Sequence, residues 1–240
     1  THANEKSVSN RVVAATVAGN ALEFYDFVTY AFFAVYIGKA FFPASTPLGS
    51  LLLAVAAFGI GFVTRPLGGI LIGRFADRAG RKPAMMLTIG LITVGTMGLA
   101  LTPSYETIGI AAPVIVVLCR LIQGLALGGE VGPSTAFLIE SAPTHRRGLY
   151  GSWQGASQGL ATLVAGGLGL WLTSNLTSEQ LQAWGWRIPF AVGLLLLPVA
   201  LYLRNNMPET LHEGTGSTPA ANQGAAGLRA HWRIIALATL

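Results

Sequence analysis

Five side chains that could carry a proton or bind a charged solute lie inside long apolar stretches of the sequence. They are Glu23, Asp26, Arg65, Arg120 and Glu130. An ionisable group within a membrane span is costly, so it usually faces the interior of a helix bundle, pairs with an opposite charge and marks a substrate or ion path. Three carboxylates against two arginines leave one acid without a basic partner, and burial favours the protonated form of such an acid. Proton coupling requires a buried acid that can bind and release a proton. We expect Asp26 to be this proton site, with Glu23 and Glu130 as alternatives.

Depth in the membrane indicates which of these charges can meet. At about 1.5 Å of rise per residue, Arg65 and Glu130 each lie about 14 Å from the charged end of their segments, so they are predicted partners. Asp26 and Arg120 lie about 22 Å and about 30 Å deep, and their pairing needs a tilted helix and a long arginine side chain. The alternative to proton coupling is purely structural pairing, with the spare acid permanently protonated.

Side chains near these charges could contact a solute. Arg65 and Arg120 could bind a carboxylate. If both are already neutralised by acids, little positive charge remains, and a zwitterion becomes an equally good cargo. Further polar contacts could come from Tyr30, Gln154 and Gln158. For each of these three, a packing or lipid-facing role is an equal alternative.

Six apolar segments, separated by short polar loops, must position these groups. Each is near the roughly 20 residues needed to cross a bilayer. The composition agrees, because 52% of the residues are hydrophobic and only 10% are charged, which is far from the average for a soluble domain. The sequence therefore predicts an all-α membrane protein with spans at residues 12–38, 48–72, 83–101, 108–139, 149–172 and 188–203.

Glycines recur every four residues in two of these segments. They are Gly124, Gly128 and Gly132 in the fourth segment, and Gly151, Gly155 and Gly159 in the fifth. Small residues at this spacing line one helix face and allow two helix backbones to approach closely. We therefore expect close helix packing along both faces.

A polar stretch between the second and third segments sets the orientation. Residues 73–82 carry four basic side chains and one acidic side chain, and loops rich in Arg and Lys stay on the cytoplasmic side of a membrane. This stretch is predicted to be a water-facing turn. Most other basic loop residues fall on the same side, so we expect a multi-pass protein of the cytoplasmic (inner) membrane with both termini in the cytoplasm.

Other classes of function find little support in the sequence. The formal net charge of +5 comes from short loops rather than from one basic face, so no nucleic-acid partner is expected. No His, Cys and carboxylate cluster has the spacing of a metal site, and the glycine-rich residues 166–169 lie in an apolar segment rather than after a soluble strand. We therefore expect no enzyme activity, no metal and no cofactor.

The two ends of the chain differ in composition from its middle. We expect a cytoplasmic tail at residues 1–11, a six-helix bundle at 12–207, a flexible cytoplasmic linker at 208–230, and the start of a truncated seventh helix at 231–240. The linker is rich in Gly, Ala, Ser and Thr. This organisation predicts that the chain is a fragment of a longer protein.

Two motifs resemble signatures of the major facilitator superfamily. Residues 73–82 resemble its loop signature, in which a glycine is followed by an aspartate, a basic residue, a glycine and two more basic residues. The positions that fit are Gly73, Asp77, Arg78, Gly80, Arg81 and Lys82. The fourth segment, from Arg120 to Glu140, resembles the arginine-bearing fourth helix of that superfamily. Residues 23–26, 65–68, 128–130, 151–154 and 186–189 are similar to motifs of its metabolite:proton symporter family.

This resemblance implies a twelve-helix transporter built of two six-helix halves, of which this chain is the N-terminal half. In proton-coupled relatives, an aspartate of the first helix and an arginine of the fourth form a proton-sensitive pair, and Asp26 and Arg120 occupy those positions. Asp77 and Arg81 would form a cytoplasmic latch with Glu140 that engages the other half.

The predicted function is therefore proton-coupled symport of a small organic acid, such as a di- or tricarboxylate of the citrate or 2-oxoglutarate type. One alternative is proton symport of a zwitterion such as proline or betaine. A different class, a non-transporting membrane receptor or assembly subunit, is the other alternative. The expected partners are the lipid bilayer, a small-molecule substrate and the C-terminal six-helix half.

Overall fold

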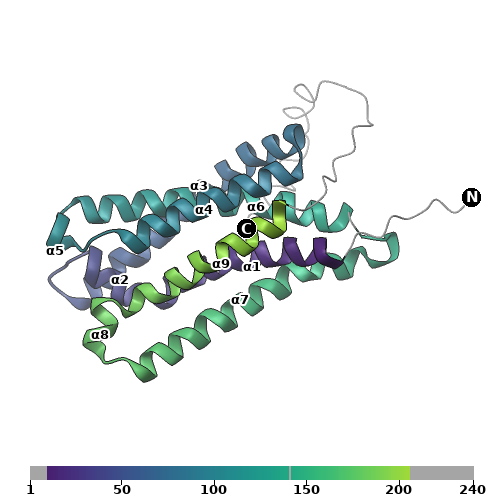
Figure 1. The fold of residues 1–240 in the computed structure, drawn as a ribbon. Coiled ribbons are helices and arrows are strands. Elements are labelled where there is room, and N and C mark those ends of the chain that lie inside the picture. The colour runs from purple at the N-terminus through teal and green to yellow at the C-terminus, as the bar shows by residue number, and fades with distance from the viewer. Residues whose placement is uncertain (1–9, 141, 206–240) are drawn as a thin grey trace, which may run out of the picture. The chain divides into compact units, whose positions relative to one another are not determined.

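The computed structural model describes residues 10–140 and 142–205, all of which belong to one compact unit. These residues form helices and turns, with no strand among them. The long helices are α1 (Asn10–Phe32), α3 (Pro47–Ala79), α4 (Arg81–Leu101), α6 (Ala111–Glu140), α7 (Arg147–Asn175) and α9 (Ile188–Asn205) (Figure 1). Short helices connect them: α2 (Ala34–Phe41), α5 (Tyr105–Ile108), α8 (Ser178–Ala183), and the 3-10 turns η1 (Thr144–Arg146) and η2 (Gly185–Arg187).

Each predicted segment corresponds to one long helix, with differences at the ends. The first segment is broken at Phe33, where α1 has ended and α2 begins one residue later. The predicted turn over residues 73–82 is wrong in extent, because α3 and α4 continue through it and only Gly80 separates them. Gly80 has a φ of 109°, a conformation that glycine adopts at little steric cost. The predicted linker and seventh helix lie outside the described residues, as does most of the predicted N-terminal tail.

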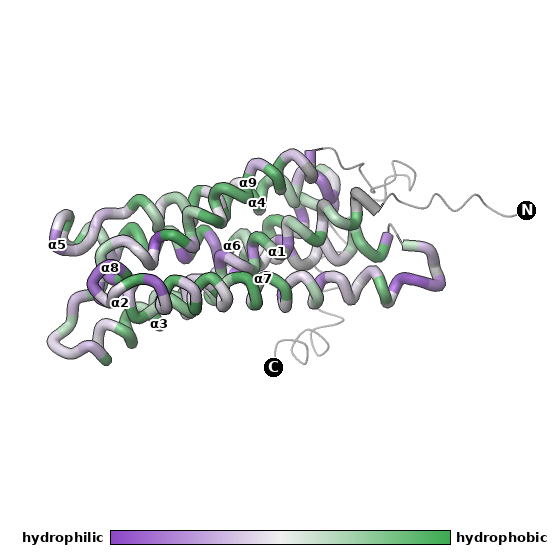
Figure 2. The backbone as a smooth tube through the Cα atoms, turned by 60° about the horizontal axis from the view of Figure 1, so that its bottom comes forward, coloured by the Kyte–Doolittle hydropathy of each residue, from purple (hydrophilic) through white to green (hydrophobic). Residues whose placement is uncertain are grey.

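Membrane-spanning character is clear for four helices. Among the described residues, α3, α4, α6 and the segment from Gly185 to Tyr202 are long and apolar enough to cross a bilayer. Hydrophobic residues dominate the middle of the helices, and hydrophilic residues gather toward their ends (Figure 2). Many large apolar side chains point outward, including Leu52, Val63, Leu163 and Leu195. An apolar outer surface is what helices in contact with lipid tails require.

The helices pack in two groups. Helix α6 packs along α3 and α4, and α1 packs along α7 and α9 (Figure 1). Contacts of α4 with α9, and of α6 with α1 and α7, join the two groups. The charged groups of the first segment thereby face those of the second and fourth.

Glycines set the closest of these contacts, between α3 and α6. A Cβ atom added at Gly68 would overlap the carbonyl oxygen of Leu125, and one added at Gly124 would overlap that of Gly61. Gly128 likewise lies against the backbone of α3. The expectation of close packing is therefore correct for two glycines of α6. It is wrong for the last glycine of α6 and for the three glycines of α7. Within the described part of the chain, an added Cβ at Gly132, Gly151, Gly155 or Gly159 would meet nothing within 4 Å.

Several helix ends meet where α3 passes into α4. The Nη2 atom of Arg81 lies 3.5 Å from Oε1 of Glu140, the last residue of α6. Lys82 donates a hydrogen bond from Nζ to the carbonyl oxygen of Asn205, the last residue of α9, at 2.5 Å. These contacts hold the ends of four helices together at the charged stretch of residues 73–82: the ends of α3, α6 and α9, and the start of α4.

Candidate proton and substrate site

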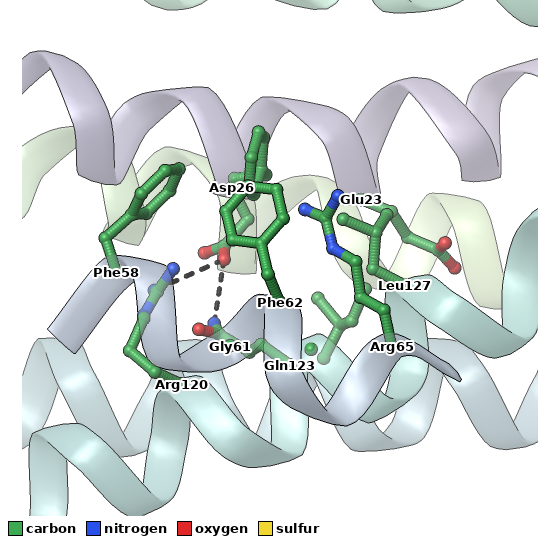
Figure 3. A pocket seen from close by; sticks show the side chains of 12 residues that line it. Glu23, Asp26, Phe58, Gly61, Phe62, Arg65, Arg120, Gln123 and Leu127 are labelled. Atoms are coloured by element: carbon green, nitrogen blue, oxygen red, sulfur yellow. Dashed lines mark hydrogen bonds and ion pairs between the residues drawn. The ribbon is translucent and has the colours of Figure 1, made fainter. Parts of the chain in front are cut away.

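A small cavity lies between α1, α3, α4 and α6 and brings together most of the charges singled out in the sequence (Figure 3). Its volume is about 20 Å³, which is about the space of one water molecule. The polar side chains that line it are Glu23, Asp26, Arg65, Arg120 and Gln123, and the apolar ones include Phe27, Phe58, Phe62 and Leu127. The cavity is therefore too small to hold an organic acid by itself.

Asp26 is held mainly by neutral hydrogen-bond donors. Thr96 Oγ1 donates to its Oδ1 at 2.7 Å, and Gln123 Nε2 donates to its Oδ2 at 2.7 Å. Arg120 Nη2 lies farther away, 3.7 Å from Oδ2 (Figure 3). The structure thus brings Asp26 and Arg120 together as a loose ion pair rather than as a hydrogen-bonded one.

Arg120 is buried, with 3% of its surface exposed. Its guanidinium lies over the ring of Tyr30, 4.1 Å from the centroid, and its Nε and Nη2 atoms have no hydrogen-bond partner among the described residues. Tyr30 is fully buried and donates its hydroxyl to the carbonyl oxygen of Ala54 at 3.0 Å. The structure therefore places Tyr30 beneath Arg120, where it supports the guanidinium and does not line the cavity.

Arg65 contacts aromatic rings instead of an acid. Its guanidinium carbon lies 3.8 Å from the ring centroid of Phe62 and 4.7 Å from that of Phe27. No ion pair joins it to any residue in the described part of the chain, and its Nε atom has no hydrogen-bond partner there. The predicted pair of Arg65 with Glu130 is therefore wrong. Similar depth does not fix the direction in which a side chain leaves its helix, and these two side chains point to different neighbours.

Glu130 and Glu23 instead meet at a threonine of α4. Thr88 Oγ1 lies 2.5 Å from Oε2 of Glu130 and 3.4 Å from Oε1 of Glu23, and also contacts the carbonyl oxygen of Met85 at 3.0 Å. Both glutamates are at most 1% exposed. A hydroxyl has one proton to donate, so it can serve only one of these three acceptors at a time. Two buried acids from α1 and α6 thus share one hydroxyl group.

The predicted amide contacts lie away from the cavity. Gln154 donates from Nε2 to Oδ1 of Asn20 at 2.8 Å and to Oγ of Ser134 at 3.3 Å, so it ties α7 to α1 and α6. Gln158 is half-buried on α7, and neither amide is among the residues that line the cavity. The structure therefore does not bring Gln154 and Gln158 to the two arginines.

The predicted latch residues are close together at the charged stretch. Arg81 Nη1 lies 2.7 Å from Oδ1 of Asp77, in addition to its contact with Glu140. Arg78 is exposed. No group of three or more metal-ligating side chains occurs within residues 10–140 and 142–205.

Two residues that hold Asp26 were not predicted as part of the site. Gln123 lies one helical turn after Arg120 on α6, a spacing that places both on one face, so it could have been found from the sequence. Thr96 gave no such signal, because threonine is an ordinary residue in an apolar helix and its neighbour comes from a distant segment.

Comparison with known proteins identifies the family. A family described as "Sugar (and other) transporter" matches residues 12–218. A citrate-proton symporter of Salmonella typhi is 39% identical over 241 residues, which cover 100% of this chain and 56% of that protein. The chain belongs to the sugar (and other) transporter family. An alpha-ketoglutarate permease of Escherichia coli (strain K12) is also 39% identical, over 92% of this chain and 50% of the relative. A proline/betaine transporter of Salmonella typhimurium is 37% identical over 83% of this chain.

The fold agrees with this family. The partially occluded, inward-open structure of the xylose transporter XylE from E. coli matches with a TM-score of 0.74 at 20% sequence identity, over 83% of this chain and 50% of that one. The chain is therefore the N-terminal six-helix half of the major facilitator fold, and it spans about half the length of the curated relatives that it matches. It is a multi-pass membrane protein of a family of transporters, not of enzymes.

Proposed function

We propose that the full-length transporter is a proton-coupled symporter of a small organic acid, a di- or tricarboxylate of the citrate or 2-oxoglutarate type. Relatives named as a citrate-proton symporter and an alpha-ketoglutarate permease support this class of cargo. The charged stretch at residues 73–82 supports a cytoplasmic position for that end of the bundle, and hence for both termini, in a cytoplasmic membrane.

The observation that carries the proposal is the free positive charge of Arg65. Its guanidinium faces the cavity beside Phe27 and Phe62, and no carboxylate of the described residues neutralises it. A buried or half-buried charge is stable only with a partner or with access to water. The carboxylate of a substrate is a suitable partner, because it can bind a guanidinium through two parallel hydrogen bonds.

Asp26 is our proposed proton carrier, and Arg120 its charged partner. Because Arg120 makes only a long contact with Asp26 and has donors without partners, protonation of Asp26 would leave Arg120 free for a second carboxylate of the substrate. Glu23 and Glu130, which share the Thr88 hydroxyl, are the alternative proton sites. The coupling ion is then the proton, and no other cofactor is required.

The remaining parts of the site are proposed to come from the other half of the transporter. The cavity is small, so a C-terminal six-helix half must supply space and further contacts. We assign Tyr30 to the support of Arg120, and Gln154 and Gln158 to the wall of the wider substrate path. The latch that would engage the other half comprises Gly73, Asp77, Arg78, Gly80, Arg81, Lys82 and Glu140.

A zwitterion such as proline or betaine is the second candidate cargo. Relatives named as proline/betaine transporters support it at 36–37% identity. A zwitterion carries one carboxylate and one cationic group, so it would use one arginine and would need an acidic or aromatic partner. The wall of phenylalanines beside Arg65 could provide the aromatic partner.

The experiment is uptake by the full-length transporter in proteoliposomes. Radiolabelled citrate, 2-oxoglutarate, proline and betaine are offered separately under an inward proton gradient, with and without a protonophore. We expect gradient-dependent accumulation of an acid, abolished by the protonophore. Accumulation of the zwitterions alone would favour the second candidate, and gradient-independent uptake of every compound would refute proton coupling.

A further inference from the structure

Only the nitrogen of the Gln123 carboxamide has hydrogen-bond partners among the described residues. Its Nε2 atom donates to Oδ2 of Asp26 at 2.7 Å and to Oγ1 of Thr96 at 3.0 Å. Its Oε1 atom is buried and has no hydrogen-bond partner among the described residues. A buried acceptor without a partner is costly. Because Nε2 donates to Oδ2, this arrangement suits an ionised Asp26, whose Oδ2 carries no proton.

Rotation of the amide would suit the other state. A carboxamide presents a donor and an acceptor on opposite sides of its terminal bond, and half a turn about that bond exchanges them. If Asp26 takes up a proton on Oδ2, it becomes a donor, and Oε1 of a rotated Gln123 can accept it. Thr96 donates to Oδ1 and can keep that bond in both arrangements, but rotation removes the hydrogen bond that its Oγ1 accepts from Nε2. Gln123 and Asp26 can therefore keep a hydrogen bond to one another in either protonation state, with its direction reversed.

Arg120 cannot adapt in this way, because a guanidinium has only donors. It is attracted to an ionised Asp26 by charge, and this charge attraction is lost when Asp26 is protonated. The pair already lacks a hydrogen bond, with Nη2 at 3.7 Å from Oδ2. Proton uptake would thus remove the charge attraction between Asp26 and Arg120, whereas Asp26 and Gln123 would stay hydrogen-bonded with donor and acceptor exchanged.

Gly95 of α4 packs directly against the side chain of Gln123. A Cβ atom added at Gly95 of α4 would lie 3.0 Å from Cδ of Gln123 and closer still to its Cγ. The absence of a side chain at Gly95 therefore gives the Gln123 side chain its space.

We propose that Gln123 is a positioning residue whose amide rotates with the protonation of Asp26, holding the protonated acid and releasing Arg120 for the anionic substrate. This rests on the proposed function, because it assumes that Asp26 takes up the proton. Other groups face the same region and must be considered in any pH titration. Within the described residues these are Glu23, Tyr25 and Tyr30 on α1, Arg65 on α3, and Cys119 and Arg120 on α6. The residues of α4 and α9 on the other side of Asp26 are apolar or threonine, apart from one glycine.

Infrared difference spectroscopy of the full-length transporter, without substrate, tests this proposal. Spectra recorded at high and low pH should show a carboxylic acid band from Asp26, identified by its loss in Asp26→Asn. They should also show a shifted amide carbonyl band, because Oε1 changes from unbonded to hydrogen-bonded. That amide band should move on ¹³C labelling of glutamine in the unchanged protein. It should vanish in Gln123→Leu and in Asp26→Asn, and persist in Gln182→Leu, which removes an amide of the short helix α8.

The labelled, unchanged protein keeps the proposal testable even if a variant fails to fold. An Asp26 band without any isotope-sensitive glutamine band would overturn the proposal, as would a glutamine band that survives in Gln123→Leu. In transport, Gln123→Leu should lower the initial rate of proton-driven uptake by roughly ten- to hundredfold, the loss expected for one hydrogen bond to a charged group. Because the spectra need no substrate, a failure of uptake in the unchanged protein would count against the proposed function alone.

Discussion

Replacing Arg65 by glutamine tests whether its free charge binds the substrate. The guanidinium is positioned by two aromatic rings, with its carbon 3.8 Å from the ring centroid of Phe62, and it has no acid to release before it can bind one. The substitution therefore removes a charge-assisted contact without breaking an ion pair within the described residues. A hydrogen bond to a charged group contributes about 1.5–3 kcal/mol, which corresponds to roughly a ten- to hundredfold change in affinity. We expect KM for the transported acid to rise by this factor.

The assay is the initial rate of substrate counterflow in proteoliposomes, measured over a range of substrate concentrations. Arg74→Gln is the matched control, because it removes an exposed arginine nine residues later on the same helix. It should leave KM within about twofold, since an exposed charge contributes little. An unchanged KM in Arg65→Gln, or an equal effect of both substitutions, would show that Arg65 does not bind the substrate.

Two further predictions concern packing and the buried acids. Gly124→Ala should lower the unfolding temperature in detergent, because the new methyl group overlaps the backbone of α3 and such overpacking costs about 1–3 kcal/mol. The control, Gly132→Ala, lies in open space on the same helix and should leave the unfolding temperature unchanged. Equal shifts in the two variants would contradict the close contact. Thr88→Val should destabilise the folded protein by about 1–3 kcal/mol through the loss of a hydroxyl between two buried acids, as judged by thermal unfolding. Its control is Thr93→Val, whose hydroxyl bonds only its own helix at the carbonyl of Ile89, and a loss no greater than in this control would refute the shared hydroxyl.

Much of the fold could be predicted because membrane spans are recognised in a sequence by their length and hydropathy. The boundary between α3 and α4 at Gly80 was harder to predict, because a charged helix end and a charged loop have the same composition. The predicted turn failed for this reason. Similarly, the four-residue glycine spacing identifies a smooth helix face but not what packs on it, so it was correct for Gly124 and Gly128 and wrong for α7.

The candidate site was predictable only in part. The rarity of charges in apolar segments singled out the ionisable residues of the cavity, and depth along each helix gave a rough register. Depth carries no information on rotation about the helix axis, so Arg65 was assigned an acid that points toward α4 instead. Neutral partners such as Thr88 and Thr96 have no sequence signature, because their role depends on side chains from helices far away in the chain.

Proton-driven accumulation by an Asp26→Asn variant tests the central claim most directly. The full-length transporter, reconstituted with an imposed pH gradient, is loaded with the acid that the unchanged protein accumulates, and counterflow exchange is measured in parallel. We predict that the variant exchanges substrate but accumulates none above equilibrium, whereas Glu179→Gln, which alters an exposed acid on α8, behaves like the unchanged protein. Accumulation that survives in Asp26→Asn would contradict the account, because another acid would then carry the proton.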